Sequence, residues 1–270
     1  MPRLRPVARA AAFFDLDKTL MAGSSGMVWA QVAYEAGQIS RRDIARWAWE
    51  HLRYRLRGAS DEATHQALTQ AREVLRGTPE RELRRMGPAV MAGVLPRIYP
   101  QMLAEVYAHQ DAGRPTFIVS AASNDLIEML ALVLGMQGGV GTRYEVDADG
   151  RYTGELDGPF VYGEGKVEAM RRYAEEHDID LAESWAYSDS ASDLPMLRAV
   201  GNPVVVNPDP ALLAVARAEG WRVMRFERLG RRLTLVGGVL VAALVGGAQA
   251  AMRRRRPARG LRAVRLGRRG

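Results

Sequence analysis

The sequence predicts an α/β protein whose core is a doubly wound parallel sheet, with an inserted all-helical cap and a C-terminal apolar helix. Strand and helix patterns alternate from residue 115 to residue 226, which is typical of a sheet covered by helices on both faces. An apolar run just before Asp15 adds a first strand, and residues 24–112 carry helix signals almost throughout. These observations indicate a Rossmann-like core that gathers ligands at the carboxyl ends of its strands.

The helical cap is recognised by its start and stop residues. A serine or an early proline begins each expected helix, and a glycine ends it. The expected helices run from Ser24 or Ser25 to Gly37, from Ser40 to Gly58, from Ser60 to Gly77, and onward from Thr78-Pro79. No strand pattern interrupts this stretch, so we expect it to form a lobe of its own.

The second half of the chain supplies the remaining strands, in an order set by hydrophobic pattern and turn residues. The order is strand 115–120, helix 123–134, a polar hairpin around 147–150, helix 164–177, strand 184–188, helix 193–199, strand 203–207, helix 210–219 and strand 221–226. We therefore assign 1–20 and 113–228 to the core, 21–112 to the cap, 229–252 to a membrane helix and 253–270 to an arginine-rich tail.

Composition limits the possible chemistry. The chain has 270 residues, 47% of them hydrophobic, enough for one or two domains with a real core. Cysteine is absent, which excludes disulfide bonds and thiol catalysis. No signal-peptide pattern precedes the first strand, so we expect a cytoplasmic core. The histidines lack metal-ligand spacing and are predicted to be surface or capping residues: His51, His65, His109 and His177.

The net charge of +7 comes from the end of the chain. Residues 253–270 contain nine arginines and no acidic residue, so the preceding part is slightly acidic. Such a run can bind anionic lipid or nucleic acid, or form a solvated arm. Because no aromatic residue interrupts the tail to stack on bases, we do not expect nucleic acid to be a partner. The sequence leaves the oligomeric state open.

Residues Leu233–Met252 form twenty positions without a charge, between two groups of arginines. A helix of this length is about 30 Å long, enough to cross a bilayer core. Carrying the arginine tail outward opposes the positive-inside rule, so a helix lying on the cytoplasmic leaflet competes with a span. A helix packed on the core is a third interpretation. We expect membrane attachment through residues 233–270.

Two carboxylates follow the first strand directly and dominate the functional prediction. Asp15 and Asp17 stand two residues apart, with Thr19 two residues further on. Crowded acids of this kind repel each other unless a cation is present, and Mg²⁺ prefers carboxylate and phosphate oxygens. Taken alone, the residues also fit a turn and an N-cap.

Three later segments place complementary chemistry where strands end or helices begin. Ser120 ends an apolar strand before a helix expected near Ser123, whose positive end favours an anion. Lys166 is one of only two lysines among 38 basic residues, and its ammonium is a compact point charge. Asp189 and Asp193 follow the strand 184–188. Each could be a cap or a solvated residue alone, but the four segments together favour a phosphate site.

This set of motifs resembles the haloacid dehalogenase (HAD) superfamily, subfamily IB, in its phosphoserine phosphatase-like branch, over residues 10–226. The resemblance implies a Mg²⁺-dependent phosphomonoester hydrolase acting on a small phosphorylated metabolite or lipid phosphate. Phosphoserine phosphatase proper, or a phosphoryl-transferring mutase, is the alternative.

The resemblance also implies a role for each residue. Asp15 would be the nucleophile that forms an aspartyl-phosphate, and Asp17 the general acid and base. The remaining assignments are Asp15, the Asp17 carbonyl and Asp189 for the metal, Ser120, Ala121 and Lys166 for phosphate, and Thr19 and Asp193 in support.

The sequence departs from that branch at two positions. A glutamate expected to meet the substrate amine is replaced by Ser24, and an expected asparagine by Ser192. Ser24 could instead cap the first cap helix. Ser24, Ser192 and Arg53 are therefore candidate substrate contacts, with Arg53 belonging to a cluster on an expected cap helix.

Overall fold

A computed structural model describes residues 9–40, 42–43 and 60–226. The helix expected over 41–57, which carries Arg53, therefore lies almost wholly outside the described residues, as do the apolar helix 233–252 and the arginine tail. Residues 1–225 form one of two structural units, and the description below concerns that unit. Within the described ranges, no helix combines the length and the apolar character needed to cross a membrane.

The core is a six-stranded parallel sheet with the order β3-β2-β1-β6-β7-β8. Its strands are β1 (Ala12–Phe14), β2 (Thr116–Ser123), β3 (Gly138–Thr142), β6 (Trp185–Ser188), β7 (Asn202–Val206) and β8 (Arg222–Met224). β1 pairs with β2 on one side and with β6 on the other. Because the chain winds outward in both directions from β1, the residues that follow β1 and β6 meet at the switch point. The predicted parallel α/β core is confirmed.

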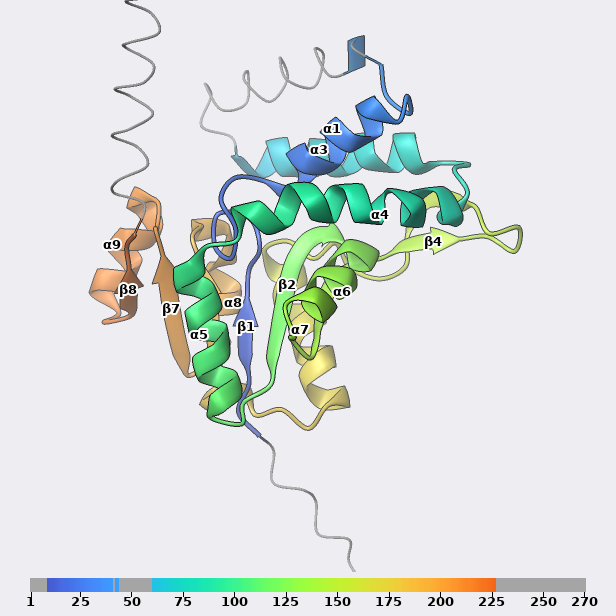
Figure 1. Ribbon diagram of the computed structural model, residues 1–270. Coiled ribbons are helices and arrows are strands. Elements are labelled where there is room, and N and C mark those ends of the chain that lie inside the picture. Colours follow the sequence, from blue (N-terminus) through green and yellow to red (C-terminus); the bar gives the residue numbers. More distant parts are fainter. Residues whose placement is uncertain (1–8, 41, 44–59, 227–270) are drawn as a thin grey trace, which may run out of the picture. The chain divides into compact units, whose positions relative to one another are not determined.

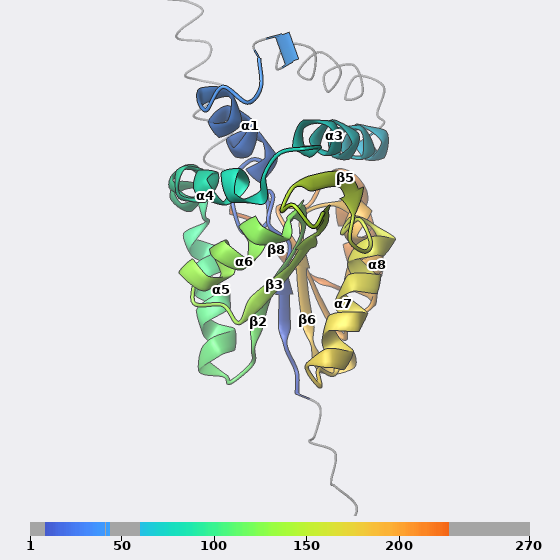
Figure 2. The same ribbon diagram turned by 90° about the vertical axis from the view of Figure 1, so that its right-hand side faces the viewer.

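Helices cover both faces of this sheet, as Figure 2 shows with the sheet nearly edge-on between them. Neighbouring residues of β1 point to opposite faces, so each face has its own core. Phe13 stacks on Phe117 beneath α7, with ring centroids 5.6 Å apart, whereas Phe14 stacks on Tyr187 at 4.4 Å. Burying each such aromatic ring contributes about 1.5–3 kcal/mol. The helices of the core are α6 (Asn124–Val133), α7 (Glu164–Glu176), α8 (Leu194–Arg198) and α9 (Pro210–Ala218).

The insertion after β1 is helical in its described parts, as expected. It comprises α1 (Ser25–Glu35), α3 (Ser60–Leu75), α4 (Glu80–Val94), the 3-10 turn η1 (Leu95–Arg97) and α5 (Pro100–Asp111). Helices α1, α3 and α4 lie above the carboxyl edge of the sheet in Figure 1. α5 runs alongside the strands instead and packs against the sheet.

α5 brings a buried histidine to the sheet, and the prediction that His109 is a surface or capping residue is wrong. Only 4% of His109 is exposed. Arg114 Nε donates to His109 Nδ1 at 2.8 Å, so the ring hydrogen is on Nε2, which lies 2.8 Å from the Tyr187 hydroxyl. The Tyr187 hydroxyl donates in turn to Glu105 at 3.0 Å. Burial and the charge of Arg114 lower the pKa of His109 to about 4.

β3 has no counterpart in the sequence prediction because it reads Gly-Gly-Val-Gly-Thr. Glycine is disfavoured within strands unless another group approaches closely. That is the case here. A Cβ on Gly139 would lie 2.2 Å from Ile127 Cγ2, and one on Gly141 would lie 2.7 Å from Asn124 Cα. The glycines let the start of α6 pack directly on the edge strand.

The predicted polar hairpin is present as β4 (Tyr144–Val146) and β5 (Tyr152–Leu156), and it holds the cap. The turn between α3 and α4 pairs with it, since Gly77 N–H donates to Tyr152 O at 2.8 Å and Tyr152 N–H donates to Thr78 O at 3.0 Å. Arg72 of α3 donates to Gly154 O at 2.6 Å and forms an ion pair with Glu155. The cap therefore contacts the core through the hairpin as well as through its two chain connections.

Candidate active site

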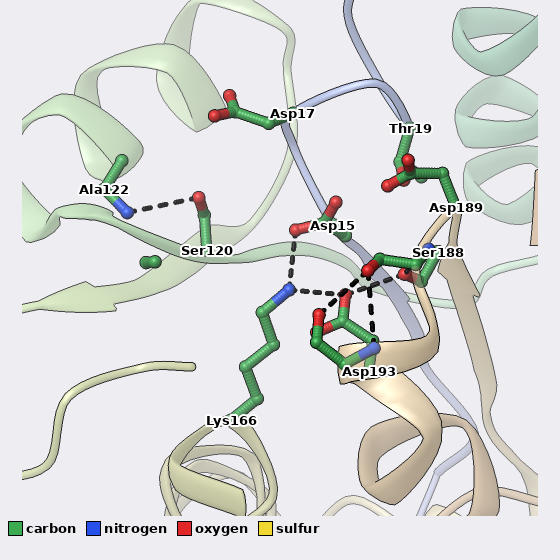
Figure 3. Close-up of polar contacts among 12 residues, drawn as sticks. Asp15, Asp17, Thr19, Ser120, Ala122, Lys166, Ser188, Asp189 and Asp193 are labelled. Atoms are coloured by element: carbon green, nitrogen blue, oxygen red, sulfur yellow. Dashed lines mark hydrogen bonds and ion pairs between the residues drawn. The ribbon is translucent and has the colours of Figure 1, made fainter. Parts of the chain in front are cut away.

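The structure brings Asp15, Lys166 and Asp193 together beneath the cap (Figure 3). Lys166 Nζ lies 2.6 Å from Asp15 Oδ1 and 2.7 Å from Asp193 Oδ2. All three residues are buried, with 7%, 3% and 2% of their surface exposed, respectively. Two buried carboxylates therefore share one ammonium at this point, and the assignment of Lys166 to phosphate stays a prediction.

Local structure explains how these residues reach one point. Asp15 directly follows β1, and its N–H donates to Tyr187 O of β6 at 3.0 Å, which fixes the strand end. Lys166 lies in the first turn of α7, after Gly163 with φ +54°. A Cβ on Gly165 would lie 1.9 Å from Phe160 O, so glycine is required where the preceding loop folds back. In the Gly-Glu-Gly-Lys segment, the glycines thus allow the turn, and the lysine supplies the buried ammonium.

The buried charges shift one another's ionisation. Burial raises the pKa of Asp15 to about 7; Lys166 opposes this shift, whereas the carboxylates of Asp193 and Asp189 add to it. Burial also raises the pKa of Asp189 to about 6, against the attraction of Lys18. Burial alone would lower the pKa of Lys166, but the carboxylates of Asp15 and Asp193 reverse this effect and raise it. The site has more buried carboxylate than one ammonium can neutralise.

Asp17 points away from Lys166 (Figure 3), and its hydrogen-bond partners lie at the start of the cap. Its Oδ2 accepts the Ser24 hydroxyl at 3.1 Å, and its Oδ1 accepts the N–H of Ser25, the first residue of α1, at 2.8 Å. Ser24 makes no side-chain capping bond to α1, so the interpretation of its hydroxyl as a helix cap is wrong. The cap helix instead holds the predicted general acid through two donors.

Ser120 and Ala121 lie at the end of β2, before α6 begins at Asn124 as expected. The Ser120 side chain is buried and accepts the Ala122 N–H at 3.2 Å. The carbonyl of Ala121 accepts the Thr142 hydroxyl of β3 at 2.9 Å. The structure therefore fixes this strand end on both sides, and the assignment of Ser120 and Ala121 to phosphate stays a prediction.

The segment after β6 carries Asp189, Ser192 and Asp193. The Thr19 hydroxyl donates to Asp189 Oδ1 at 3.4 Å, which joins the end of β1 to the end of β6. The Ser192 side chain pairs with the Ser190 hydroxyl at 2.9 Å, which engages it locally rather than toward the cap.

Ser188 belongs to the site and was not among the predicted residues. Its buried hydroxyl donates to Asp193 Oδ2 at 2.7 Å, the oxygen that also contacts Lys166. The alternation of serine and acid in this segment is the sequence signal that could have indicated it.

Among the described residues, no group of three or more imidazole and carboxylate side chains is placed to hold a metal ion. The predicted Mg²⁺ set is smaller, with the side chains of Asp15 and Asp189 and the main-chain carbonyl of Asp17. Such a set is compatible with Mg²⁺, which keeps several waters and substrate oxygens. Asp193 Oδ1 is buried and has no hydrogen-bond partner within the described part of the chain. Together with the surplus of carboxylates, this orphan acceptor indicates that the residues fit a cation.

Comparisons with known proteins agree with this geometry. The sequence pattern of haloacid dehalogenase-like hydrolases matches residues 12–198. The chain is 36% identical to an "inhibition of morphological differentiation protein" of Streptomyces azureus, over 82% of this chain and 79% of that protein. It is 32% identical to a phosphoserine phosphatase of Mycobacterium tuberculosis, over 93% and 82%. It is 31% identical to a histidinol-phosphatase of Neisseria meningitidis, over 80% and 98%.

Solved structures show the same fold. A Bordetella pertussis protein of unknown function matches 80% of this chain and 98% of its own, with a TM-score of 0.69 and 30% identity. A substrate-bound phosphoserine phosphatase matches 84% and 98%, with a TM-score of 0.58 and 18% identity. The chain belongs to the haloacid dehalogenase-like hydrolase family, and it is an enzyme of the phosphatase type. The family resemblance predicted from the motifs is confirmed, and Mg²⁺ is the metal that phosphatases of this family generally use.

Proposed function

We propose that this chain is a Mg²⁺-dependent phosphomonoester hydrolase that works through an aspartyl-phosphate on Asp15. The observation that carries the proposal is the contact of Lys166 with Asp15 and Asp193, at 2.6 and 2.7 Å, at the carboxyl edge of the sheet. A buried carboxylate next to a fixed ammonium can attack a phosphoryl group whose charge the ammonium offsets.

The reaction divides into two displacements at phosphorus. In the first, an oxygen of Asp15 bonds to phosphorus, and the bond to the leaving oxygen breaks while Asp17 protonates that oxygen. In the second, water attacks the aspartyl-phosphate, Asp17 takes the water proton, and Asp15 is released with free phosphate. Lys166, Ser120 and the N–H of Ala121 hold the phosphoryl oxygens throughout.

The metal fits the acidic side of this site. Asp15, Asp189 and the Asp17 carbonyl would hold Mg²⁺, with Asp193 in support. When bound, Mg²⁺ offsets the negative charge of the phosphoryl group and of the nucleophile. Thr19 orients Asp189 and Ser188 orients Asp193, so the described hydrogen bonds support the ligands from outside.

We infer that the substrate is a small phosphorylated metabolite or a lipid phosphate other than phosphoserine. Residue 24 is a serine whose hydroxyl donates to Asp17, so no acid there can pair with a substrate ammonium. Two relatives are named for phosphoserine and for histidinol phosphate, and phosphoserine phosphatase proper is the alternative. We expect L-phosphoserine to be hydrolysed poorly.

A panel of phosphomonoesters tests this proposal, with free phosphate as the readout and Mg²⁺ saturating. The panel includes L-phosphoserine, histidinol phosphate and a lysophosphatidate, and rapid acid quenching with ³²P-labelled substrate measures labelled protein. We expect labelled protein and stoichiometric phosphate. Label without phosphate release identifies a mutase. No label with any substrate contradicts the aspartyl-phosphate, and phosphoserine as the best substrate contradicts the inference from Ser24.

We further propose attachment to a membrane through residues 233–270, on the basis of sequence alone. The support is the twenty-residue uncharged segment followed by nine arginines, which suits an apolar helix next to anionic headgroups. Fractionation compares the full chain with a truncation after Glu227. We expect only the full chain to sediment with membranes. If both are soluble without detergent at low and high salt, the proposal is wrong.

A further inference from the structure

Asp209 lies outside the residues assigned so far, yet it contacts the segment that carries Asp189. It follows β7 and is the N-cap residue of α9. Its Oδ1 accepts the Leu212 N–H at 2.7 Å, and its Oδ2 accepts the Ala191 N–H at 3.3 Å. Its own N–H donates to the carbonyl of Asp189 at 3.2 Å. One residue thus contacts both a helix start and the segment between the two acids.

Three main-chain N–H groups of the acid-bearing segment, residues 188–193, donate within the segment. Ser190 N–H donates to the Ser188 hydroxyl at 3.2 Å, and Ser192 N–H donates to the Ser190 hydroxyl at 3.3 Å. Asp193 N–H donates to Ser190 O at 3.1 Å. The Ala191 N–H, in the middle of the segment, donates outside it to Asp209. Asp209 therefore ties the acid-bearing segment to the end of the neighbouring strand.

The hydrogen bond between Asp209 and Ala191 lies where it can affect metal binding. β6 and β7 are adjacent and parallel, with Ser188 opposite Val205, so their following segments meet at one edge of the sheet. Ala191 stands two residues from Asp189 and two residues from Asp193. A displacement at Ala191 therefore moves both acids at once. Hydrogen-bond partners outside a metal's ligands typically change its affinity about 10–100-fold when removed.

Helix capping alone does not account for Asp209. An N-cap side chain needs one oxygen, which here accepts the Leu212 N–H. The second oxygen contacts Ala191, whose N–H belongs to a different structural element, η3 (Ala191–Asp193). We propose that Asp209 is a positioning residue that fixes the acid-bearing segment for Mg²⁺. This inference rests on the proposed function, which places Asp189 among the metal ligands.

Thermal unfolding of the full chain in a Mg²⁺ titration tests the proposal, with the metal alone as probe. Asp209→Ala removes both contacts, whereas Asp209→Ser keeps a good N-cap but is too short to contact Ala191 as well. We expect both variants to need about tenfold more Mg²⁺ for half-maximal stabilisation. In phosphatase assays, the Mg²⁺ activation constant rises equally while kcat at saturating Mg²⁺ changes little.

Asp180→Ala is the matched control. Asp180 Oδ1 accepts the Ala182 N–H at 2.9 Å in the same capping role, but it precedes β6 at the opposite edge of the sheet. We expect this variant to unfold at a lower temperature with an unchanged Mg²⁺ requirement.

Three outcomes overturn the inference. If Asp209→Ser binds Mg²⁺ as the wild type does, capping explains Asp209, and the metal site still stands. If Asp180→Ala weakens Mg²⁺ as much as Asp209→Ala, the effect is general destabilisation. If Mg²⁺ does not stabilise the wild type at all, the metal assignment of the proposed function fails first, and the role of Asp209 fails with it.

Discussion

Asp15 and Asp17 are two residues apart in sequence, but the molecule holds them in opposite ways. Asp15 is buried on the core side, 2.6 Å from an ammonium that also contacts Asp193. Asp17 is only partly buried and accepts a hydroxyl and an N–H from the start of the first cap helix. The core side therefore supplies fixed charge, whereas the cap side supplies neutral donors. In the proposed mechanism, phosphoryl binding depends on the core side, and proton transfer depends on Asp17, which the start of the cap helix holds.

The sheet explains the rigidity of the core side. Phe14, next to Asp15, stacks on Tyr187, whose carbonyl accepts the Asp15 N–H. The Tyr187 hydroxyl is fixed by His109 and Glu105 of α5. Asp17, by contrast, lies in the turn that leads to the cap, where Lys18 has φ +59°. Residues in this left-handed region are uncommon outside tight turns.

The largest expected difference between Asp15 and Asp17 is in the step of the reaction that each amide substitution blocks. Asp15→Asn should abolish phosphate release because the amide is not a nucleophile. Asp17→Asn should still form the aspartyl-phosphate but turn over at least about 10²-fold more slowly, because the proton donor and base is lost. Rapid-quench labelling and steady-state phosphate release measure the two effects. Equal, mild losses for both variants would contradict the division of roles.

Removing the Lys166 ammonium should strongly lower both activity and stability. Lys166→Met should lower kcat/KM about 10²–10³-fold, because one fixed donor to the phosphoryl oxygens is lost. It should also destabilise the fold by about 3–5 kcal/mol, since it leaves two buried carboxylates unpaired. Arg171→Met, an exposed position on the same helix, is the control for assays and urea unfolding. Near-normal activity in Lys166→Met would show that the ammonium is only structural.

A smaller effect is expected on the cap side. Ser24→Ala removes the hydroxyl that donates to Asp17 and should lower kcat about tenfold, the scale of one hydrogen bond to a charged group. KM should change little, because Ser24 does not contact the substrate in this interpretation. Ser24→Thr restores the hydroxyl and should recover most of kcat, and Ser40→Ala is a control on an exposed cap residue. A rise in KM for a charged substrate alone would instead make Ser24 a substrate contact.

The buried His109, which packs against the sheet, should make the stability of the fold depend on pH. Burial and the charge of Arg114 lower the pKa of His109 from its ordinary value of 6.5 to about 4 in the folded chain, so the unfolded chain takes up this proton at a higher pH. Unfolding free energy should therefore fall as pH drops through this window, by about 3 kcal/mol from His109. Urea unfolding at pH 7 and pH 4.5 should show a smaller fall in His109→Gln, with exposed His177→Gln as control. The same fall in His109→Gln would exclude this histidine as the cause.

The parallel core and the polar residues at its strand ends could be predicted from the sequence, because short stretches of neighbouring residues determine both. Asp15, Lys166 and Asp189 stand beside apolar strands or helix starts whose pattern is readable without partners. The glycine-rich strand β3 could not be predicted, because its glycines are required by the close packing of α6, a tertiary contact that the local sequence does not reveal. The hydrogen-bond partners of Ser24, His109 and Asp209 could not be predicted either, because they belong to elements that only the tertiary fold brings close.

The chain segments just before α1 and just after η1 lie next to each other. Met21 and Ile98 form a bridge, Ala22 N–H donates to Arg97 O at 2.8 Å, and Tyr99 N–H donates to Leu20 O at 2.9 Å. A segment whose ends are already adjacent can be replaced by another of different length at little cost in loop-closure entropy. For protein engineering, residues 26–96 are thus an exchangeable segment, with Ser24 and Ser25 kept as the donors to Asp17. Grafting a foreign lobe between Ser25 and Arg97 offers a route to new substrate preferences while Asp15, Lys166 and Asp193 keep their contacts.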